Sequence, residues 1–406
     1  MAKKIPQQPE INIGTAGHVD HGKTTLVEAL TGKWTSMHSE ELRRGITIKI
    51  GYADAPVYYC PDTDSYNTEG SCNGKEAILK RVVSFVDSPG HESLMANMLS
   101  GSAIIDGALL VIAANEQVPQ PQTREHLQAL NMIGVSKLIV VQNKVDLISY
   151  DEAKLNHEKI MDFLESYGHK NTPIVPVSAR TGLNIDMLLT IMEKHIPTPQ
   201  RDENAPAQMQ VIRSFDINKP GSQIEALKGG VLGGTLKAGI LRVGDKIEIK
   251  PGIYIAERGS YLPVETEVVS LATSGGLVES VKPGGLIGVG TRLDPTFTKS
   301  DLMLGNYIAA PGVLPDPITE TDIKVELFSS IIGVNELIKV EKLKPKEMVK
   351  LNVGTMVTFG TIQDINDDNI HLVLRRPVCA LKGTRIAISR RIGDRWKLAG
   401  SSTIMS

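Results

Sequence analysis

The stretch GHVDHGKTT, from Gly17 to Thr25, decides how the first half of the chain is interpreted. It holds two histidines and an aspartate within four residues, a cluster that could bind a transition metal. It also has the spacing G-x-x-x-x-G-K-T, the pattern of a loop whose backbone N–H groups surround phosphate oxygens. An apolar run at residues 11–13 precedes it and a helical pattern over 24–30 follows it. Because a phosphate loop requires a strand before it and a helix after it, the sequence favours the phosphate loop.

The first half of the chain alternates short apolar runs with helical patterns. The predicted strands span residues 11–13, 82–86, 108–113, 138–141 and 174–177, and the predicted helices span 24–30, 123–133, 151–167 and 184–195. Such an alternation is typical of a doubly wound, mostly parallel sheet with helices on both faces. We therefore predict an α/β P-loop domain over residues 1–205, ending in the Pro-rich segment 195–209.

The second half of the chain has short strands separated by glycines, as in KGGVLGG (228–234) and KPGGLIGVG (282–290). Helical periodicity is weak there, and closely spaced short strands are typical of β barrels. A second Pro-rich break, PGVLPDPIT (311–319), divides this region. We therefore predict two all-β barrel domains, over residues 206–318 and 319–406.

Composition restricts the class of protein. The 406 residues are too many for one ordinary core, and the net charge of −2 means that a polyanion would have to meet a local basic patch. Three cysteines exclude a disulfide framework and favour a reducing compartment. The first twelve residues lack the apolar run of a signal peptide, and no stretch reaches the roughly 18 apolar residues of a membrane span. We expect a cytoplasmic protein with no membrane partner.

Two motifs predict binding of phosphates and Mg²⁺. In the glycine loop, Lys23 is expected to neutralise charge on the β- and γ-phosphates, and the Thr24 hydroxyl to bind Mg²⁺. The second motif, DSPGH, follows the strand 82–86. There Asp87 is placed to meet the water shell of Mg²⁺, and the N–H of Gly90 is placed to reach a γ-phosphate.

Two further motifs predict a guanine site. In N-K-x-D, the carboxylate of Asp146 accepts from guanine N1–H and the 2-amino group, neither of which adenine offers as a donor. Two charge-assisted hydrogen bonds of about 1.5–3 kcal/mol each would discriminate at least hundredfold. Lys144 can lie over the base, and the Ser178-Ala179-Arg180 segment can supply a backbone N–H for guanine O6. All four motifs follow predicted strands, and ligands of doubly wound sheets bind at that edge.

The predicted nucleotide-binding residues share that edge. They are Val19, Asp20, His21, Gly22, Lys23, Thr24, Thr25, Asp87, Gly90, Asn143, Lys144, Asp146, Ser178, Ala179 and Arg180. The segment 38–51 is predicted to be an order–disorder switch, because Thr47 can complete the Mg²⁺ shell only when a γ-phosphate is present. Its switch residues are Arg44, Gly45, Ile46 and Thr47, although the Arg43–Arg44 pair is equally well explained as solvated charge.

GHVDHGKTT, RRGITI, DSPGH and NKVD together resemble the translational GTPases, the class of elongation factor Tu, across essentially the whole chain. Longer stretches narrow the resemblance to the γ subunits of archaeal and eukaryotic translation initiation factor 2, and in particular to the archaeal form. These stretches are WTSMHSEELRRGITIKIGYAD (34–54), GALLVIAANEQVPQPQTREHL (107–127), IRSFDINKPG (212–221) with KGGVLGG, and RIAISRRIGDRW (385–396).

The resemblance implies a GTPase that carries initiator methionyl-tRNA to the small ribosomal subunit, in a heterotrimer with α and β subunits. It also implies that His91 is catalytic and orients the attacking water, while Val19 and Ile46 gate its approach. Asp20 and the Gly45 carbonyl match positions that hold a second Mg²⁺. An elongation-type or selenocysteine-specific tRNA carrier, a nucleotide-stabilised assembly scaffold and a GTP-dependent metal chaperone remain as alternatives.

Residues 53–80 depart from the pattern and are predicted to be an insertion. Many archaeal relatives carry a zinc knuckle with two C-x-x-C pairs there, whereas this chain keeps only Cys60 and Cys72. Two thiolates do not complete a tetrahedral zinc site, so we expect no structural zinc. The segment then needs another source of order.

A basic run near the C-terminus contains a single acid between residues 375 and 397. The predicted RNA-contacting residues are Arg375, Arg376, Arg385, Arg390, Arg391 and Arg395. The alternative is a β domain whose outward residues simply face water. Aromatic residues make up only 4% of the chain, which argues against base stacking as the main mode of RNA binding.

Overall fold

The computed structural model describes residues 5–35, 50–89, 99, 103–219, 221, 223, 227–328 and 339–404. The chain forms two compact units, residues 1–199 with 332–338, and residues 200–331 with 339–406. Each unit is described by itself.

The first unit is built on a seven-stranded sheet in the order β3-β2-β6-β1-β7-β8-β9. Its strands are β1 (Ile11–Ala16), β2 (Gly51–Cys60), β3 (Ser65–Asn67), β6 (Ile78–Asp87), β7 (Gly107–Ala113), β8 (Leu138–Asn143) and β9 (Ile174–Pro176). The strands from β6 to β9 are parallel, and β2 and β3 add an antiparallel edge. Every residue of β1, β7 and β8 is buried, as expected for strands covered on both faces.

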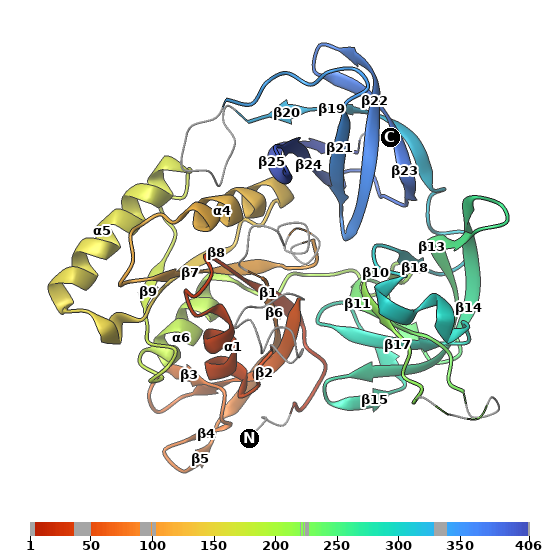
Figure 1. Ribbon diagram of the computed structural model, residues 1–406. Coiled ribbons are helices and arrows are strands. Elements are labelled where there is room, and N and C mark those ends of the chain that lie inside the picture. The colour runs from red at the N-terminus through yellow and green to blue at the C-terminus, as the bar shows by residue number, and fades with distance from the viewer. Residues whose placement is uncertain are drawn as a thin grey trace. The chain divides into compact units, whose positions relative to one another are not determined.

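Helices cover both faces of this sheet (Figure 1). On one face lie α1 (Lys23–Thr31) and α6 (Ile185–His195), whose Leu26 and Met192 share a core with Phe85 and Leu109. On the other face lie α4 (Pro121–Ile133) and α5 (Tyr150–Ser166). The predicted doubly wound α/β fold is confirmed.

The second unit begins with a β barrel. Its strands are β10 (Gln208–Phe215), β11 (Val231–Ala238), β13 (Lys246–Ile255), β14 (Ser260–Thr273), β15 (Gly276–Val278), β17 (Ile287–Thr291) and β18 (Tyr307–Ala309). They are ordered β13-β18-β10-β11-β17-β14-β15, and β13 also pairs with β14, so the sheet closes on itself. The short strands β12 (Leu241–Arg242) and β16 (Ser280–Val281) pair beside it.

A second barrel-like sheet follows within the same unit. Its strands are β19 (Ile318–Lys324), β20 (Glu326–Leu327), β21 (Met348–Val353), β22 (Met356–Asn366), β23 (Asn369–Val378), β24 (Arg385–Ile392) and β25 (Arg395–Thr403), in the order β19-β23-β22-β21-β24-β25-β20. Side chains join it to the first barrel: the Thr355 hydroxyl donates to the Val211 carbonyl at 3.1 Å, and the buried Tyr307 packs with Leu314 and Cys379. The two predicted β domains are therefore packed together through buried groups.

The segment predicted as an insertion, 53–80, is shorter than expected. Residues through Cys60 belong to β2, which pairs with β6 along its length, and β6 itself begins at Ile78. The sequence did not predict β2 because this antiparallel strand mixes glycine, proline, tyrosine and aspartate without periodicity. The segment between β2 and β6 holds β3, β4 (Ser71–Cys72) and β5 (Lys75–Glu76).

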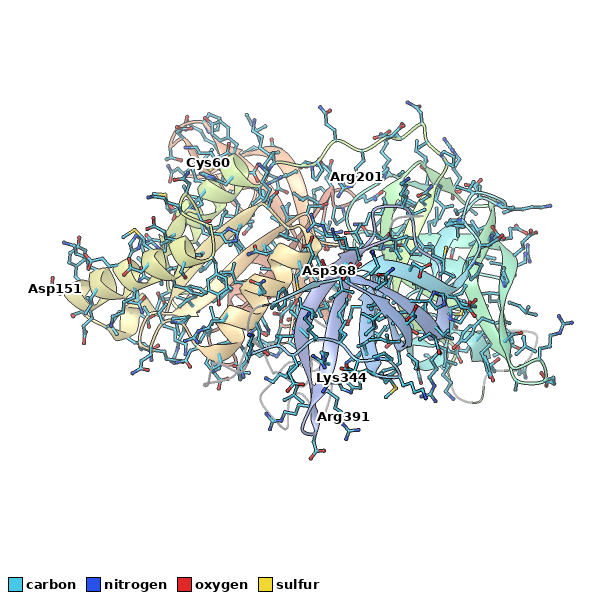
Figure 2. The ribbon with its side chains drawn as sticks, turned by 90° about the horizontal axis from the view of Figure 1, so that it is seen from above. Cys60, Asp151, Arg201, Lys344, Asp368 and Arg391 are labelled. Carbon is cyan, nitrogen blue, oxygen red and sulfur yellow. A yellow bond between two sulfur atoms is a disulfide. The ribbon has the colours of Figure 1, made fainter. Side chains whose placement is uncertain are left out.

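A disulfide between Cys60 and Cys72 gives this segment the source of order that the sequence left open. Both cysteines are buried, and Cys60 lies at the end of β2 (Figure 2). The Asn67 side-chain amide donates to Cys60 Sγ at 3.2 Å and to the Ser71 carbonyl at 2.9 Å. Asn67 Oδ1 also accepts the N–H of Glu69 at 3.0 Å. The bridge and this one amide together fix the loop.

We predict that thiol titration will detect the Cys60–Cys72 disulfide and that this disulfide stabilises the segment. Thiol titration of the unfolded, unreduced chain should find one free thiol, Cys379, out of three cysteines. Closing a loop of this length is worth about 3 kcal/mol, so Cys60→Ser should raise amide exchange over residues 61–76 by on the order of a hundredfold. Cys379→Ser is the matched control and should leave that exchange unchanged. Three free thiols would contradict the prediction.

Candidate nucleotide-binding site

Four segments converge at one edge of the first unit's sheet. The glycine loop follows β1, Asp87 is the last residue of β6, Asn143 is the last residue of β8, and Ser178 follows β9. These four strands are parallel, so their carboxyl ends meet at the same edge. The sheet thus brings together the four motifs that are far apart in the sequence.

The glycine loop is shaped by two glycines with positive φ. Gly17 has φ +131° and Gly22 has φ +90°, conformations that side chains disfavour. An added Cβ on Gly17 would lie 2.2 Å from the Val111 carbonyl oxygen, and one on Gly22 would lie 2.4 Å from Asn143 Nδ2. Both glycines are therefore required by backbone conformation and by close packing against neighbouring strands.

Lys23 begins α1 and points back over the loop. Its Nζ donates to the carbonyls of Gly17 at 3.0 Å and His18 at 2.6 Å. Burial lowers the pKa of Lys23 to about 8, while the nearby carboxylates of Asp87 and Asp20 oppose that shift. Within the described part of the chain this buried ammonium bonds neutral carbonyls, which balance its charge poorly, so an anion in this loop would be strongly favoured.

Thr24 and Asp87 lie side by side, as a shared Mg²⁺ site requires. The Asp87 carboxylate accepts hydroxyls from Thr15 at 3.0 Å, Thr24 at 2.8 Å and Thr35 at 2.6 Å. Burial raises the pKa of Asp87, and these hydroxyls together with Lys23 oppose the shift. A buried carboxylate beside a threonine hydroxyl is the hard oxygen donor set that Mg²⁺ prefers, so the residues fit the ion.

Asn143 joins the phosphate side of the site to the base side. Its Nδ2 donates to the His21 carbonyl at 2.9 Å, and its Oδ1 accepts the Ala179 N–H at 3.0 Å. The predicted donor to guanine O6, the Ala179 N–H, is therefore engaged within the chain. Ser178 is fully buried, and its Oγ accepts the Thr181 N–H at 3.3 Å.

The other base-side residues reach the surface. Lys144 is half-buried with φ +64°, and Asp146 and Arg180 are exposed. On the phosphate side, Val19 and Thr25 are half-buried, and Asp20 is exposed with φ +61°. Exposed groups at this edge are accessible to a ligand.

Several predicted site residues lie outside the described residues. They are Arg44, Gly45, Ile46, Thr47, Gly90 and His91. Of the predicted second Mg²⁺ pair, only Asp20 is described. Within the described ranges, no group of three or more His, Cys, Asp or Glu side chains is arranged to hold a metal ion. The transition-metal interpretation of His18 and His21 gains no support there, because His21 is buried and bonded within the protein.

Sequence reasoning missed two residues that contact the loop, Glu116 and His126. His126, on α4, accepts the Gly17 N–H through Nδ1 at 2.8 Å. Glu116 Oε2 lies 3.3 Å from His21 Nε2, and its Oε1 lies 3.9 Å from Lys144 Nζ. His21 Nδ1 lies 3.1 Å from the Val111 carbonyl, so both partners of this ring are acceptors and a neutral ring can donate to only one. Both residues lie in the stretch 107–127 that carries the family resemblance, but neither belongs to one of the four nucleotide motifs, so their contact with the loop was not predicted.

The predicted RNA-contacting arginines do not form one surface. Arg390 makes a two-point ion pair with Glu347, at 2.6 and 3.0 Å, and also bonds the Glu341 carbonyl. Arg376 is half-buried over the ring of Tyr261 and donates to the Leu304 carbonyl at 3.3 Å. These two arginines make contacts within the second unit, and their contact with RNA stays a prediction.

The remaining predicted arginines, Arg375, Arg385, Arg391 and Arg395, are exposed. Arg391 and Arg395 lie at the turn of the β24–β25 hairpin, where Figure 2 marks Arg391. Arg385 lies at the other end of β24, about 20 Å away at the rise of an antiparallel strand. The basic run is therefore spread along a strand, and only its turn gathers exposed arginines.

Known families match both ends of the chain. Residues 8–198 match the model of the elongation factor Tu GTP binding domain, and residues 319–404 match that of initiation factor eIF2 gamma, C terminal. The chain is 52% identical over 401 residues to translation initiation factor 2 subunit gamma of Archaeoglobus fulgidus, covering 98% of this chain and 94% of that protein. The corresponding protein of Methanocaldococcus jannaschii is 50% identical over 406 residues, covering 99% of both.

The chain belongs to the translation initiation factor 2 gamma subunit family.

Solved structures agree on the architecture of this gamma-subunit family member. A bacterial selenocysteine-specific elongation factor, EF-Sec, matches with a TM-score of 0.73 and 26% identity over 97% of this chain and 58% of that one. Elongation factor SelB from Methanococcus maripaludis, solved with the GTP analogue GppNHp, matches with a TM-score of 0.72 and 23% identity over 99% of this chain and 80% of that one. The P-loop GTPase domain followed by β-barrel domains is confirmed.

As a member of this family, the chain is a translational GTPase, and the family binds GTP, GDP and Mg²⁺. No helix in the described part of the chain is long and apolar enough to cross a membrane.

The buried histidines beside the loop predict acid sensitivity. Burial lowers the pKa of His21 and of His126 to about 3 each, so unfolding below pH 6.5 takes up protons that the fold excludes. Stability is therefore lost as pH falls from 6.5 toward 3. In the His126→Asn variant, the free energy of unfolding should fall with decreasing pH by about 1.4 kcal/mol per pH unit less than in the original chain. The contribution of Asp87 is the same in both proteins and therefore cancels in the comparison.

Urea unfolding of nucleotide-free protein at pH 6.5, 5.5 and 4.5, monitored by amide exchange in β1 and β6, measures this slope. Replacement of the exposed His195 by Asn is the control and should not change it. Parallel slopes for the original chain and His126→Asn would contradict the prediction.

Proposed function

We propose that this chain is the GTP-dependent carrier of initiator methionyl-tRNA to the small ribosomal subunit. The observation that carries the proposal is the match of the whole chain, at 52% identity, to initiation factor 2 gamma subunits, together with four nucleotide motifs at one sheet edge. The chain is proposed to act with α and β subunits in the cytoplasm and to release the tRNA after hydrolysing GTP to GDP.

The phosphate side of the site supplies charge and position. Lys23 Nζ would exchange its carbonyl partners for phosphate oxygens, which is favourable because a buried ammonium gains an opposite charge. Thr24 and Asp87 would hold Mg²⁺, Asp87 through a water. When bound, the ion supplies charge that balances the phosphates. Thr47 is proposed to bind it only in the GTP state.

The hydrolytic step is assigned to His91, which would orient the attacking water with Val19 and Ile46 controlling access. Gly90 would donate its N–H to the γ-phosphate. A second Mg²⁺ between Asp20 and the Gly45 carbonyl is part of the same proposal. These roles rest on the family resemblance.

The base side supplies specificity for guanine. Asp146 is exposed at the sheet edge, where its carboxylate can accept from N1–H and the 2-amino group, and Lys144 can lie over the ring. Asn143 would act by holding the two loops rather than by touching the base, since both ends of its amide are engaged. To bind guanine O6, the Ala179 N–H would have to donate to Asn143 and to O6 together. Otherwise the segment at Arg180 would have to move so that the N–H is released from Asn143.

We also propose that the chain needs no structural zinc. Cys60 and Cys72 are bonded to each other and are therefore not available as thiolate ligands.

An elongation-type carrier is the second candidate, because the selenocysteine-specific factor EF-Sec and the elongation factor SelB match 97% and 99% of this chain in fold. It shares the GTP chemistry and differs only in the tRNA that it accepts. The match of residues 319–404 to the initiation-factor C-terminal region favours the initiator tRNA.

Filter binding separates the two candidates. GTP-loaded protein should retain initiator methionyl-tRNA at least tenfold more tightly than elongator methionyl-tRNA, and GDP-loaded protein should retain less of both. Equal retention of the two tRNAs would reject the initiator assignment. Retention that is independent of the nucleotide would instead favour a scaffold role.

The exposed arginines give a separate test of the RNA surface. Charge reversal at Arg391 and Arg395 should weaken tRNA binding and reduce its salt dependence by about one unit of slope per lost phosphate contact, with GTP affinity unchanged. Arg242→Glu, at an exposed arginine of the other barrel, controls for net charge. An unchanged salt slope would show that the arginines at this turn do not contact the RNA.

A further inference from the structure

A histidine of α4 accepts a hydrogen bond from the backbone of the loop that would hold the phosphates. His126 is fully buried, and its Nδ1 lies 2.8 Å from the backbone nitrogen of Gly17, the first residue of the loop. The two residues are 109 positions apart in the sequence. The contact therefore links α4 to the loop directly, across the end of the sheet.

This hydrogen bond fixes the protonation of the ring. The Gly17 N–H is a donor, so Nδ1 must present its lone pair and the proton must sit on Nε2. Burial, which lowers the pKa of His126 to about 3, keeps the ring in this neutral form. In the described part of the chain, Nε2 has no hydrogen-bond partner. Among the described residues, the hydrogen bond from Gly17 is therefore the one polar contact of this buried ring.

Gly17 is held on both sides of its backbone. Its N–H is bound by His126, and its carbonyl accepts Lys23 Nζ at 3.0 Å. Its φ of +131° and the 2.2 Å approach of an added Cβ to the Val111 carbonyl leave little room for another conformation. A change at His126 would therefore change how the Gly17 carbonyl meets Lys23.

We propose that His126 is a positioning residue for the nucleotide's β- and γ-phosphates. It touches neither phosphate, and acts by fixing the Gly17 peptide and, through its carbonyl, the place of the Lys23 ammonium. The inference rests on the proposed nucleotide site in the glycine loop. It goes beyond that site because α4 carries none of the four nucleotide motifs.

The alternative is an ordinary core histidine that only stabilises the fold. Such a role would lower stability without changing how strongly the site distinguishes GDP from GMP. A positioning role predicts that loss of the histidine weakens GDP binding more than GMP binding, because GMP has no β- or γ-phosphate for Lys23 to contact. The ratio of the two affinities is therefore the informative measurement.

The experiment measures GDP and GMP affinities by competition with a fluorescent GDP analogue, in Mg²⁺ buffer, on the full chain. His126→Leu keeps the bulk of the ring but offers no acceptor to Gly17. It should lose about tenfold in GDP affinity, the effect of one buried hydrogen bond, with GMP affinity unchanged. His126→Asn places an amide oxygen near the position of Nδ1 and should recover most of the loss.

His169→Leu is the matched control. His169 Nε2 lies 2.7 Å from Asn131 Oδ1 on the same helix α4, so this variant also removes a histidine contact to α4 but leaves the loop alone. Its GDP to GMP ratio should equal that of the original chain. Urea unfolding of each variant establishes that it is folded under the binding conditions.

Four outcomes are decisive. An unchanged ratio for His126→Leu overturns the inference, and so does an equal loss in His126→Leu and His126→Asn. If the original chain does not bind GDP, the proposed nucleotide site itself fails. A selective loss of GDP affinity that Asn restores supports the positioning role.

Discussion

The Asn143 amide is the contact on which the geometry of the nucleotide site depends. It lies at the end of β8, 2% exposed, and one side chain both donates to the phosphate loop and accepts from the loop after β9. A carboxylate could not donate to His21, and an alanine would leave a buried carbonyl and a buried N–H unpaired. The close approach also excludes any side chain at Gly22, 2.4 Å from Nδ2. One residue thereby links the glycine loop to the loop after β9.

The phosphate end of the site is electrostatically incomplete in a way that defines its ligand. Lys23 is buried with carbonyl partners and Asp87 with hydroxyl partners, and among the residues that the structure describes neither charge forms a direct ion pair. Burial lowers the pKa of the first group and raises that of the second. An anion beside Lys23 and a cation beside Thr24 and Asp87 would relieve both costs together, which is what a nucleotide phosphate with its Mg²⁺ provides.

The sequence predicted the parts of the fold that are marked by a clear hydrophobic pattern or by a motif. The strands over 82–86, 108–113 and 138–141 were recognisable because each is a short apolar run, interrupted only by Ser84, and the carboxyl ends of parallel strands lie at one edge of the sheet. The strand over 51–60 was not, because its first seven residues pair with a strand on one side only, a position that tolerates polar residues and proline. Contacts between residues far apart in the sequence were not predictable either. The Cys60–Cys72 bond depends on how the loop folds. Arg376 and Arg390 were assigned to RNA because the sequence does not show which charged residues pair within the fold.

The contacts that escaped prediction explain why the phosphate loop keeps its shape. Three neighbouring elements bond its backbone or side chains: β7 through the Val111 carbonyl at His21, β8 through Asn143, and α4 through His126. The motif G-x-x-x-x-G-K-T supplies glycines that can adopt the conformation, but it does not choose among the conformations open to glycine. That choice is made by the surrounding fold, at the cost of burying two neutral histidines beside the loop. A loop fixed in this way needs little rearrangement when a nucleotide arrives, so most of the interaction with the phosphates can appear as affinity.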